Sequence, residues 1–138
     1  MKRLFFTLSL LLLTITGFAQ TISNAQLLAL GRTKATVKKM VPAGYSYYKV
    51  EENDYGFTDL YKKGTSIIGY SFNFREDICQ SVGTGISRSS WKAVEADLAH
   101  KYKKHDGMWY ANHNDPFVYS ISRETPVYML IAMKNTEY

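Results

Sequence analysis

One helical pattern near the middle of the chain separates two strand-rich halves, and it constrains the fold more than any other feature. In residues 89–105, SSWKAVEADLAHKYKKH, the apolar residues are spaced as on one side of an α-helix: Trp91, Val94, Leu98 and Tyr102. Ser89 or Ser90 can cap the first turn, and Gly107 is placed to end the helix. The apolar stripe must be buried, so we expect this helix to pack against a sheet.

Strand signals occupy most of the remaining chain. Runs rich in aromatic and β-branched residues, bounded by turn residues, predict four strands before the helix and three after it: 45–51, 57–62, 66–74, 78–86, 108–112, 117–122 and 127–134. The short links between consecutive strands favour antiparallel neighbours. A first helix is expected over 23–41. Ser23 and Gln26 form its capping box, and Pro42 follows its end.

The beginning of the chain has the pattern of a secretory signal peptide. Two basic residues precede a mostly apolar run over 4–15, and the small residue Ala19 stands where cleavage is expected. The run is shorter than the roughly 20 apolar residues that cross a membrane, and no later stretch approaches that length. We therefore expect a signal peptide at 1–19, a mature chain at 20–138 that does not span the membrane, and a periplasmic or secreted location.

Chain length limits the number of cores. Removing 19 of the 138 residues leaves 119, enough for one core and not for two. We expect one domain at 20–138 with an α+β fold: an antiparallel sheet of six or seven strands with two helices packed on one face. A cystatin-like helix wrapped by a four-strand sheet, with the second half appended, is the alternative. Because the element order is alike in 23–86 and 89–134, these halves are candidates for a helix-plus-three-strand internal repeat, with strand 78–86 extra in the first.

Alternation along the expected strands separates a bulky face from a small or polar face. The bulky residues are Ile68, Tyr70, Phe72, Phe74, Ile78, Val82, Ile86, Phe117, Tyr119, Ile121, Val127, Met129, Ile131 and Met133. The small or polar residues are Gly69, Ser71, Asn73, Cys79, Ser81, Gly83, Gly85, Ser120 and Ser122. We expect the helices to cover the bulky face and to leave the other face open. The reverse assignment is the alternative, because small residues also let helices approach closely.

Charge and cysteine content argue against two classes of protein. The mature chain keeps 15 of the 17 basic residues against 12 acidic ones, an excess too mild to indicate nucleic-acid binding. Cys79 is the only cysteine, so no intrachain disulfide can form. We expect Cys79 to be a small, partly buried apolar residue, with a reactive thiol or an intermolecular bridge as the alternative.

Residues that could carry catalysis or bind a metal are sparse. The histidines and their acidic neighbours near the end of the central helix are His100, His105, Asp106, His113 and Asp115. His100 and His105 are five residues apart, so they do not share a helix face as the two ligands of a zinc helix do. A second acidic group comprises Glu51, Glu52, Asp54 and Asp59, and its turn setting predicts solvated carboxylates rather than an acid–base pair. We expect no metal and no cofactor.

Aromatic content is the remaining unusual feature. Seventeen aromatic residues lie in the mature chain, and eleven of them are tyrosines, whose apolar ring and hydroxyl suit a recognition surface as well as ordinary strands. With one sheet face expected to be open, the candidate contact residues are Ser71, Asn73, Ser81, Ser120 and Tyr128.

Several local motifs resemble those of small exported proteins of Bacteroidota-type bacteria that remain uncharacterised. They are the signal ending Gly17-Phe18-Ala19-Gln20, the Phe72-x-Phe74…Ile78-Cys79 hairpin, the Leu98-x-x-Lys101-Tyr102 helix end and Trp109. The resemblance implies a periplasmic or secreted location and transfers no catalytic residue. In architecture, a repeated helix-plus-strands unit is similar to the β-lactamase-inhibitor-protein and TATA-box-binding-protein folds, whose open sheet faces bind partners.

These observations favour a non-enzymatic binding module of the cell envelope, with a protein or an envelope glycan bound on the open sheet face. A small hydrolase using His105, Asp106, His113 and Asp115 is the first rival, and it should lose activity on His113→Ala with its fold intact. A purely structural homo-oligomer is the second, and its mass should depend on concentration.

Overall fold

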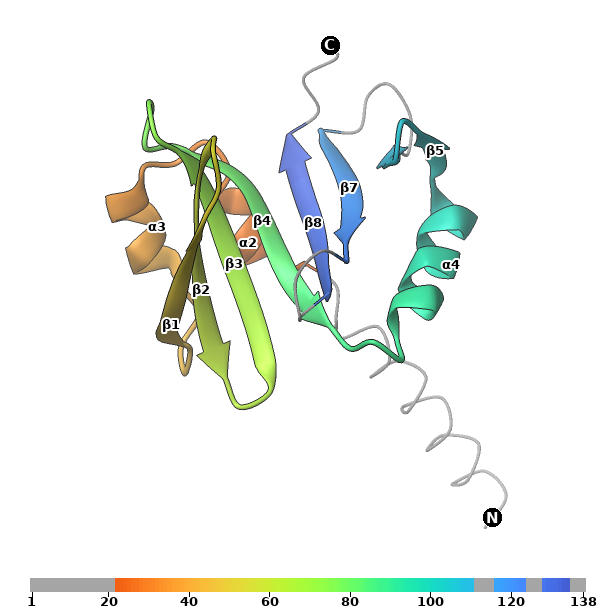
Figure 1. The fold of residues 1–138 in the computed structure, drawn as a ribbon, viewed down its shortest axis with the longest axis horizontal. Helices are drawn as coiled ribbons and strands as arrows, with labels where there is room; N and C mark the ends of the chain where they lie inside the picture. The colour runs from red at the N-terminus through yellow and green to blue at the C-terminus, as the bar shows by residue number, and fades with distance from the viewer. Residues whose placement is uncertain (1–21, 111–115, 124–127, 135–138) are drawn as a thin grey trace.

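The computed structural model describes residues 22–110, 116–123 and 128–134, and all its strands belong to one antiparallel sheet (Figure 1). The elements are α2 (Asn24–Leu28), α3 (Lys34–Met40), β1 (Ser46–Glu52), β2 (Gly56–Lys63), β3 (Ser66–Asn73), β4 (Cys79–Ile86), α4 (Trp91–Lys101), β5 (Lys103–His105), β6 (Met108–Tyr110), β7 (Phe117–Ser122) and β8 (Tyr128–Lys134). The α+β class and the antiparallel sheet are as expected, whereas the sheet has eight strands rather than six or seven.

Strand order is symmetric about the centre of the sheet. The order is β1-β2-β3-β4-β8-β7-β6-β5, so the last strand of each half lies at the centre and the first lies at an edge. Each half of this sheet therefore contributes four strands, and β4 has a counterpart in β8. The expectation that strand 78–86 is extra in the first half was wrong. Whether the halves arose by duplication stays a prediction.

The additional strand, β5, comes from the end of the expected central helix. Tyr102 already has extended backbone angles, and β5 then pairs with β6. Asp106 and Gly107 both have positive φ, 51° and 78°, which is the conformation of a two-residue hairpin turn. Gly107 therefore turns a hairpin and does not end a helix. The helix itself runs over Trp91–Lys101 rather than 89–105.

The expected first helix is broken into α2 and α3. Gly31 has a φ of +81°, its amide donates to the Cys79 carbonyl at 2.9 Å, and the Cys79 amide donates to the Arg32 carbonyl at 2.8 Å. Thr33 then caps α3 by accepting a hydrogen bond from the Thr36 amide. Residues 31–33 thus pair with the start of β4, and these bonds replace the helical ones that the sequence pattern predicted.

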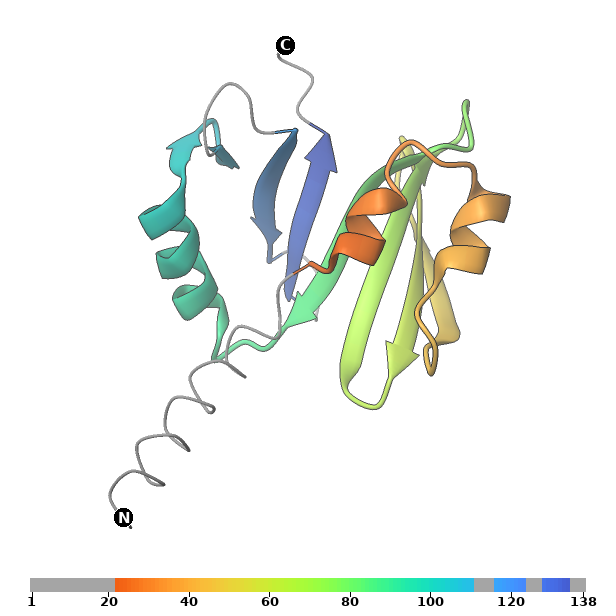
Figure 2. The ribbon, with the colours of Figure 1, turned by 180° about the vertical axis from the view of Figure 1, so that it is seen from behind.

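Two clusters of buried apolar residues join the helices to the same face of the sheet (Figure 2). The first contains Ala29, Leu30 and Val37 from the α2–α3 region, packed against strand residues such as Tyr70 and Val82. The second contains Leu98, Ile86, Trp109 and Leu130, with Trp91, Val94 and Tyr102 beside them, which is the apolar stripe of the central helix. Ile22 and Tyr119 touch both clusters, so one apolar layer runs beneath the sheet.

The sequence analysis assigned the odd-numbered residues of β8 and Cys79 to the wrong faces of the sheet. Val82 is paired with Ala132 and Gly83 with Ile131, so the even-numbered residues of β8 face the helices. Met129, Ile131 and Met133 therefore lie on the open face. Cys79 lies in the first core cluster and is 3% exposed, because Gln80 is unpaired in a bulge that shifts the register of β4 against β3.

Candidate binding surface on the open sheet face

The face of the sheet opposite the helices combines glycines, serines and half-buried apolar side chains. Its central strands β3, β4 and β8 contribute Gly69, Ser71, Ser81, Gly83, Gly85, Met129, Ile131 and Met133. Thr58 of β2 and Ser120 and Ser122 of β7 continue this surface on either side, and Leu60 and Val118 lie on the same face but are buried, at 7% and 4% exposure. We call this set the open face. In Figure 1 no described helix lies in front of β1 to β4, whereas in Figure 2, which views the molecule from behind, α2 and α3 lie in front of these strands.

Two paired glycines form the lowest part of the open face. Gly69 of β3 lies directly opposite Gly83 of β4. A Cβ atom at Gly69 would lie 3.0 Å from Leu60 Cδ2, and one at Gly83 would lie 3.0 Å from Met129 Cε. Leu60 and Met129 thus lean over the glycines from both sides. Both glycines are buried, so the surface here is an apolar floor made by the Leu60 and Met129 side chains that cover them.

A row of hydroxyl groups runs beside the glycines. Thr58 Oγ1 and Ser71 Oγ are 2.7 Å apart, Ser71 is paired with Ser81, and Ser81 is paired with Met133. These side chains are half-buried. The row offers donors and acceptors next to the apolar floor, which is the composition of a recognition surface with a polar margin.

The five predicted contact residues fall in three places. Ser71 and Ser81 are neighbours on the open face, and Ser120 lies on the same face opposite Ile131. Asn73 is at the end of β3, where its side chain accepts a hydrogen bond of 2.7 Å from the Glu76 amide and thereby orders the β3–β4 turn. Tyr128 is paired with Ile86 and packs against Trp91, so it lies on the helix-covered face.

The sequence analysis did not place the three β8 residues Met129, Ile131 and Met133 on the open face. Alternation within β8 could not reveal them, because Tyr128 and Leu130 are as apolar as their neighbours. Only the pairing of β8 with β4 fixes which set is covered.

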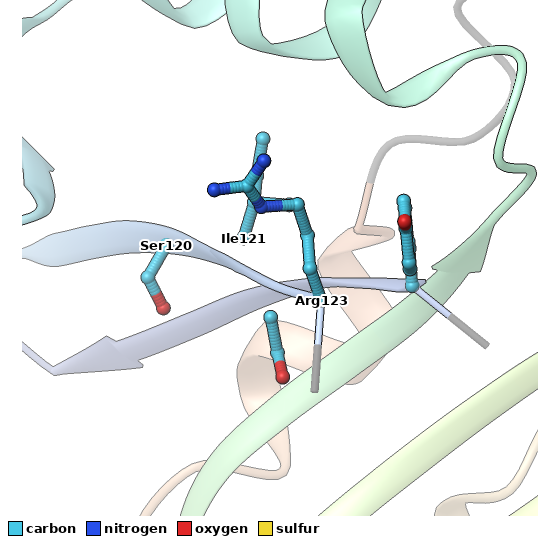
Figure 3. A pocket seen from close by; sticks show the side chains of 5 residues that line it. Ser120, Ile121 and Arg123 are labelled. Atoms are coloured by element: carbon cyan, nitrogen blue, oxygen red, sulfur yellow. The ribbon is translucent and has the colours of Figure 1, made fainter. Parts of the chain in front are cut away.

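A pocket of about 580 Å³ lies at the end of β7 and β8 and is lined by Ser120, Ile121, Ser122, Arg123 and Tyr128. Figure 3 shows Ile121 and Arg123 on the α4 side of β7 and Ser120 pointing to the opposite side. The Arg123 guanidinium lies 4.5 Å from the Trp91 ring centre. Because the lining comes from both faces of the sheet, this pocket does not assemble a set of groups that point at one ligand.

The residues of the hydrolase hypothesis are only partly described. His105 Nε2 and Asp106 Oδ2 are 3.3 Å apart on the β5–β6 turn, and their side chains are 75% and 88% exposed. His113 and Asp115 lie outside the described residues. Within 22–110, 116–123 and 128–134, no group of three or more potential ligands is placed to hold a metal ion. The hydrolase stays a hypothesis.

One acidic residue expected at the surface is buried. Asp59 is 4% exposed, since it lies in the same phase of β2 as Phe57 and Tyr61, on the helix side. Its carboxylate is 3.8 Å from Lys34 Nζ, which also lies 4.5 Å from the centre of the Phe57 ring. This pair holds α3 against β2 and belongs to the fold rather than to the open face.

A polar residue of α2 supports the open face from behind. Gln26 is 3% exposed, and its amide nitrogen donates to the Gly83 carbonyl at 3.0 Å. Its side-chain oxygen accepts from Thr84 Oγ1 at 3.2 Å and from the Ser23 amide at 3.2 Å. The sequence predicted Gln26 as a capping residue, and the capping box is present. Its second role, bonding to β4, had no local signal.

The buried Cys79 thiol and Tyr70 hydroxyl should lower the free energy of unfolding at alkaline pH. Burial raises the pKa of the Cys79 thiol from 9.0 to about 12 and the pKa of the Tyr70 hydroxyl from 10.0 to about 12. Both groups ionise earlier in the unfolded chain, so the free energy of unfolding should hold below pH 9 and fall between pH 9 and 12. Denaturant titrations at pH 8 and 10.5 measure this loss. Cys79→Ala should make the loss smaller, and an equal loss in the variant would contradict the assignment.

Comparisons with other proteins give no functional assignment. No family model, curated protein or solved structure matches the chain. Among the described residues, none of the helices combines the length and the apolar character needed to cross a membrane.

Proposed function

We propose that this chain is an exported, non-enzymatic binding module of the cell envelope, and that its open face binds a protein. The observation that carries the proposal is the half-buried apolar surface of Met129, Ile131 and Met133 beside the paired glycines of β3 and β4. Large apolar side chains held on the side of a sheet away from its helices gain free energy when a partner covers them.

The composition of this surface favours a protein over a glycan. Methionine side chains are flexible and polarizable, so they adapt to apolar side chains of a partner. Leu60 and Met129 cover the paired glycines with an apolar layer against which such side chains can pack. Ser71 and Ser81 supply hydrogen bonds at the margin. The described aromatic pairs of the central strands, such as Tyr61 with Tyr70, lie on the helix side and are not available to stack on sugar rings.

The first test uses residues 20–138 as bait in an envelope extract of the host, with crosslinks mapped by residue. We expect a saturable protein partner whose crosslinks fall on β3, β4, β7 and β8. A partner crosslinked only to the helices would contradict the proposal. Capture of glycan in place of protein would contradict the choice of partner.

A charged substitution at the centre of the open face should weaken this binding. Met133→Lys places an ammonium group beside Ser81, and we expect the affinity for the captured partner to fall at least roughly tenfold, as for a central interface residue. Leu28→Lys is the matched control, because Leu28 is 63% exposed on α2, on the other side of the sheet. Titration calorimetry measures both, and equal affinities for Met133→Lys and the unsubstituted chain would contradict the prediction.

A further inference from the structure

The two edges of the sheet are built differently. The β5 edge has three residues, Lys103, Lys104 and His105, and all are exposed. A short strand of basic residues is a usual device against pairing with another chain. The β1 edge has seven residues without proline, and Tyr47, Tyr48 and Val50 are 57%, 49% and 43% exposed. Among the described strands, none pairs with the outer side of β1.

The hairpin that follows β1 fixes which backbone groups point outward. The Asn53 amide donates to the Gly56 carbonyl at 2.9 Å, so these two residues form a hydrogen-bonded pair with β2. Antiparallel pairing alternates, and the register is regular from Lys49 to Glu52. The backbone groups of Lys49 and Glu51 therefore point toward β2. Those of Val50 and Glu52 point away from the sheet and are oriented to accept a further strand.

The charges of β1 are complementary to a second copy of the same strand. If two β1 strands run antiparallel about a two-fold axis at Val50, each Val50 lies opposite its equivalent in a hydrogen-bonded pair. Lys49 of each copy then lies opposite Glu51 of the other. These residues occupy the non-hydrogen-bonded positions, where opposing side chains are closest. Lys49 and Glu51 already form an ion pair of 3.2 Å within one strand, so the two strands would bring four alternating charges together.

We propose that two copies of this chain associate through β1, antiparallel and centred on Val50, so that their sheets become continuous. A two-fold axis perpendicular to the sheet places both open faces on the same side of the dimer. If the open face binds a partner as proposed above, the dimer presents two binding faces to the same side. The dimer itself does not depend on that function, and purified chain alone tests it.

Charge reversal in β1 tests the pairing. Sedimentation equilibrium of residues 20–138 should show a mass rising toward that of a dimer as the concentration increases. Lys49→Glu or Glu51→Lys should each place like charges opposite each other twice and weaken the dimer roughly tenfold or more. The double variant Lys49→Glu/Glu51→Lys should restore it. A monomer at every concentration, or single variants that dimerise like the unsubstituted chain, would overturn the proposal.

Two substitutions of Val50 test the edge and the register separately. Val50→Pro removes only an outward amide, so it should abolish the dimer while circular dichroism and the melting temperature stay close to those of the parent chain. Val50→Cys should form an intermolecular disulfide under mild oxidation, because opposed Cα atoms in such a pair are about 5.5 Å apart. Tyr48→Cys is its control and should not crosslink to itself. Crosslinking at residue 48 instead of residue 50 would overturn the register and the proposal with it.

Discussion

Replacing Gln26 with leucine should lower the free energy of unfolding by about 2–4 kcal/mol. The buried Gln26 side chain bonds to the Gly83 carbonyl, the Thr84 hydroxyl and the Ser23 amide. Leucine fills a similar volume but leaves the Gly83 carbonyl and the Thr84 hydroxyl without this partner in a buried region, and it removes the bond to the Ser23 amide. The loss is measured by urea titration followed by circular dichroism.

The control for this substitution is Gln80→Leu. Gln80 is the exposed, unpaired residue of the β4 bulge, so the same exchange there should change the stability by less than about 0.5 kcal/mol. Thr84→Val removes one partner of Gln26 and should cost about 1 kcal/mol. Equal stabilities of Gln26→Leu and Gln80→Leu would show that the contact between α2 and β4 is not the support described above.

Gly56→Ala should destabilise the fold by more than about 2 kcal/mol, because any Cβ at this position overlaps the backbone. The contacted atoms are the carbonyl of Phe72 and the Cα of Asn73, and neither can move without breaking the pairing of β2 with β3. The Asn53 side chain also accepts hydrogen bonds from the Tyr55 and Gly56 amides, so the same turn orders the end of β1. Thermal unfolding measures the change.

Gly64→Ala separates steric overlap from backbone strain. Gly64 has a φ of +59° and no atom within 4 Å of an added Cβ, so alanine there meets only the conformational penalty of about 1 kcal/mol. A melting temperature for Gly56→Ala that equals that of Gly64→Ala would contradict the steric explanation.

Local signals in the sequence were sufficient for all of the described strands except β5. Seven of the eight strands coincide with expected ones, because alternation and turn residues such as Asn53 and Gly64 act locally. The apolar stripe of α4 was also predictable, since a 3.6-residue period needs no knowledge of the partner surface. The antiparallel arrangement followed from the short links.

The errors at 31–33 and at Asp59 arose where a long-range contact overrides a local preference. Residues 31–33 leave the helical path because they bond to the start of β4. Asp59 is buried because Lys34, 25 positions earlier in the chain, lies beside it. Nothing within a few residues of 31–33 or of Asp59 records those contacts. The error at β5 was local, because Asp106 and Gly107 form the hairpin turn that pairs β5 with β6, whereas Gly107 was interpreted as the end of a helix.

The candidate binding surface could be predicted only in part, because it also depends on contacts between distant segments. Ser71, Ser81 and Ser120 were placed on the open face by alternation within their own strands. The β8 residues depend on the register of β8 against β4, which pairs segments about 50 residues apart. Both faces of β8 are apolar, so its sequence does not show which residues face the helices. The structure was needed to place Met129, Ile131 and Met133 on the open face.

The most direct measurement places a photo-activated crosslinking residue at Ser81 in one variant and at Lys38 in another, and follows adducts in the intact envelope. Ser81 lies at the centre of the open face, whereas Lys38 is exposed on α3, on the helix side. If the open face is the binding surface, Ser81 should give a defined protein adduct that Met133→Lys abolishes, and Lys38 should give none. Adducts of equal yield at both positions, or an adduct at Lys38 alone, would contradict it.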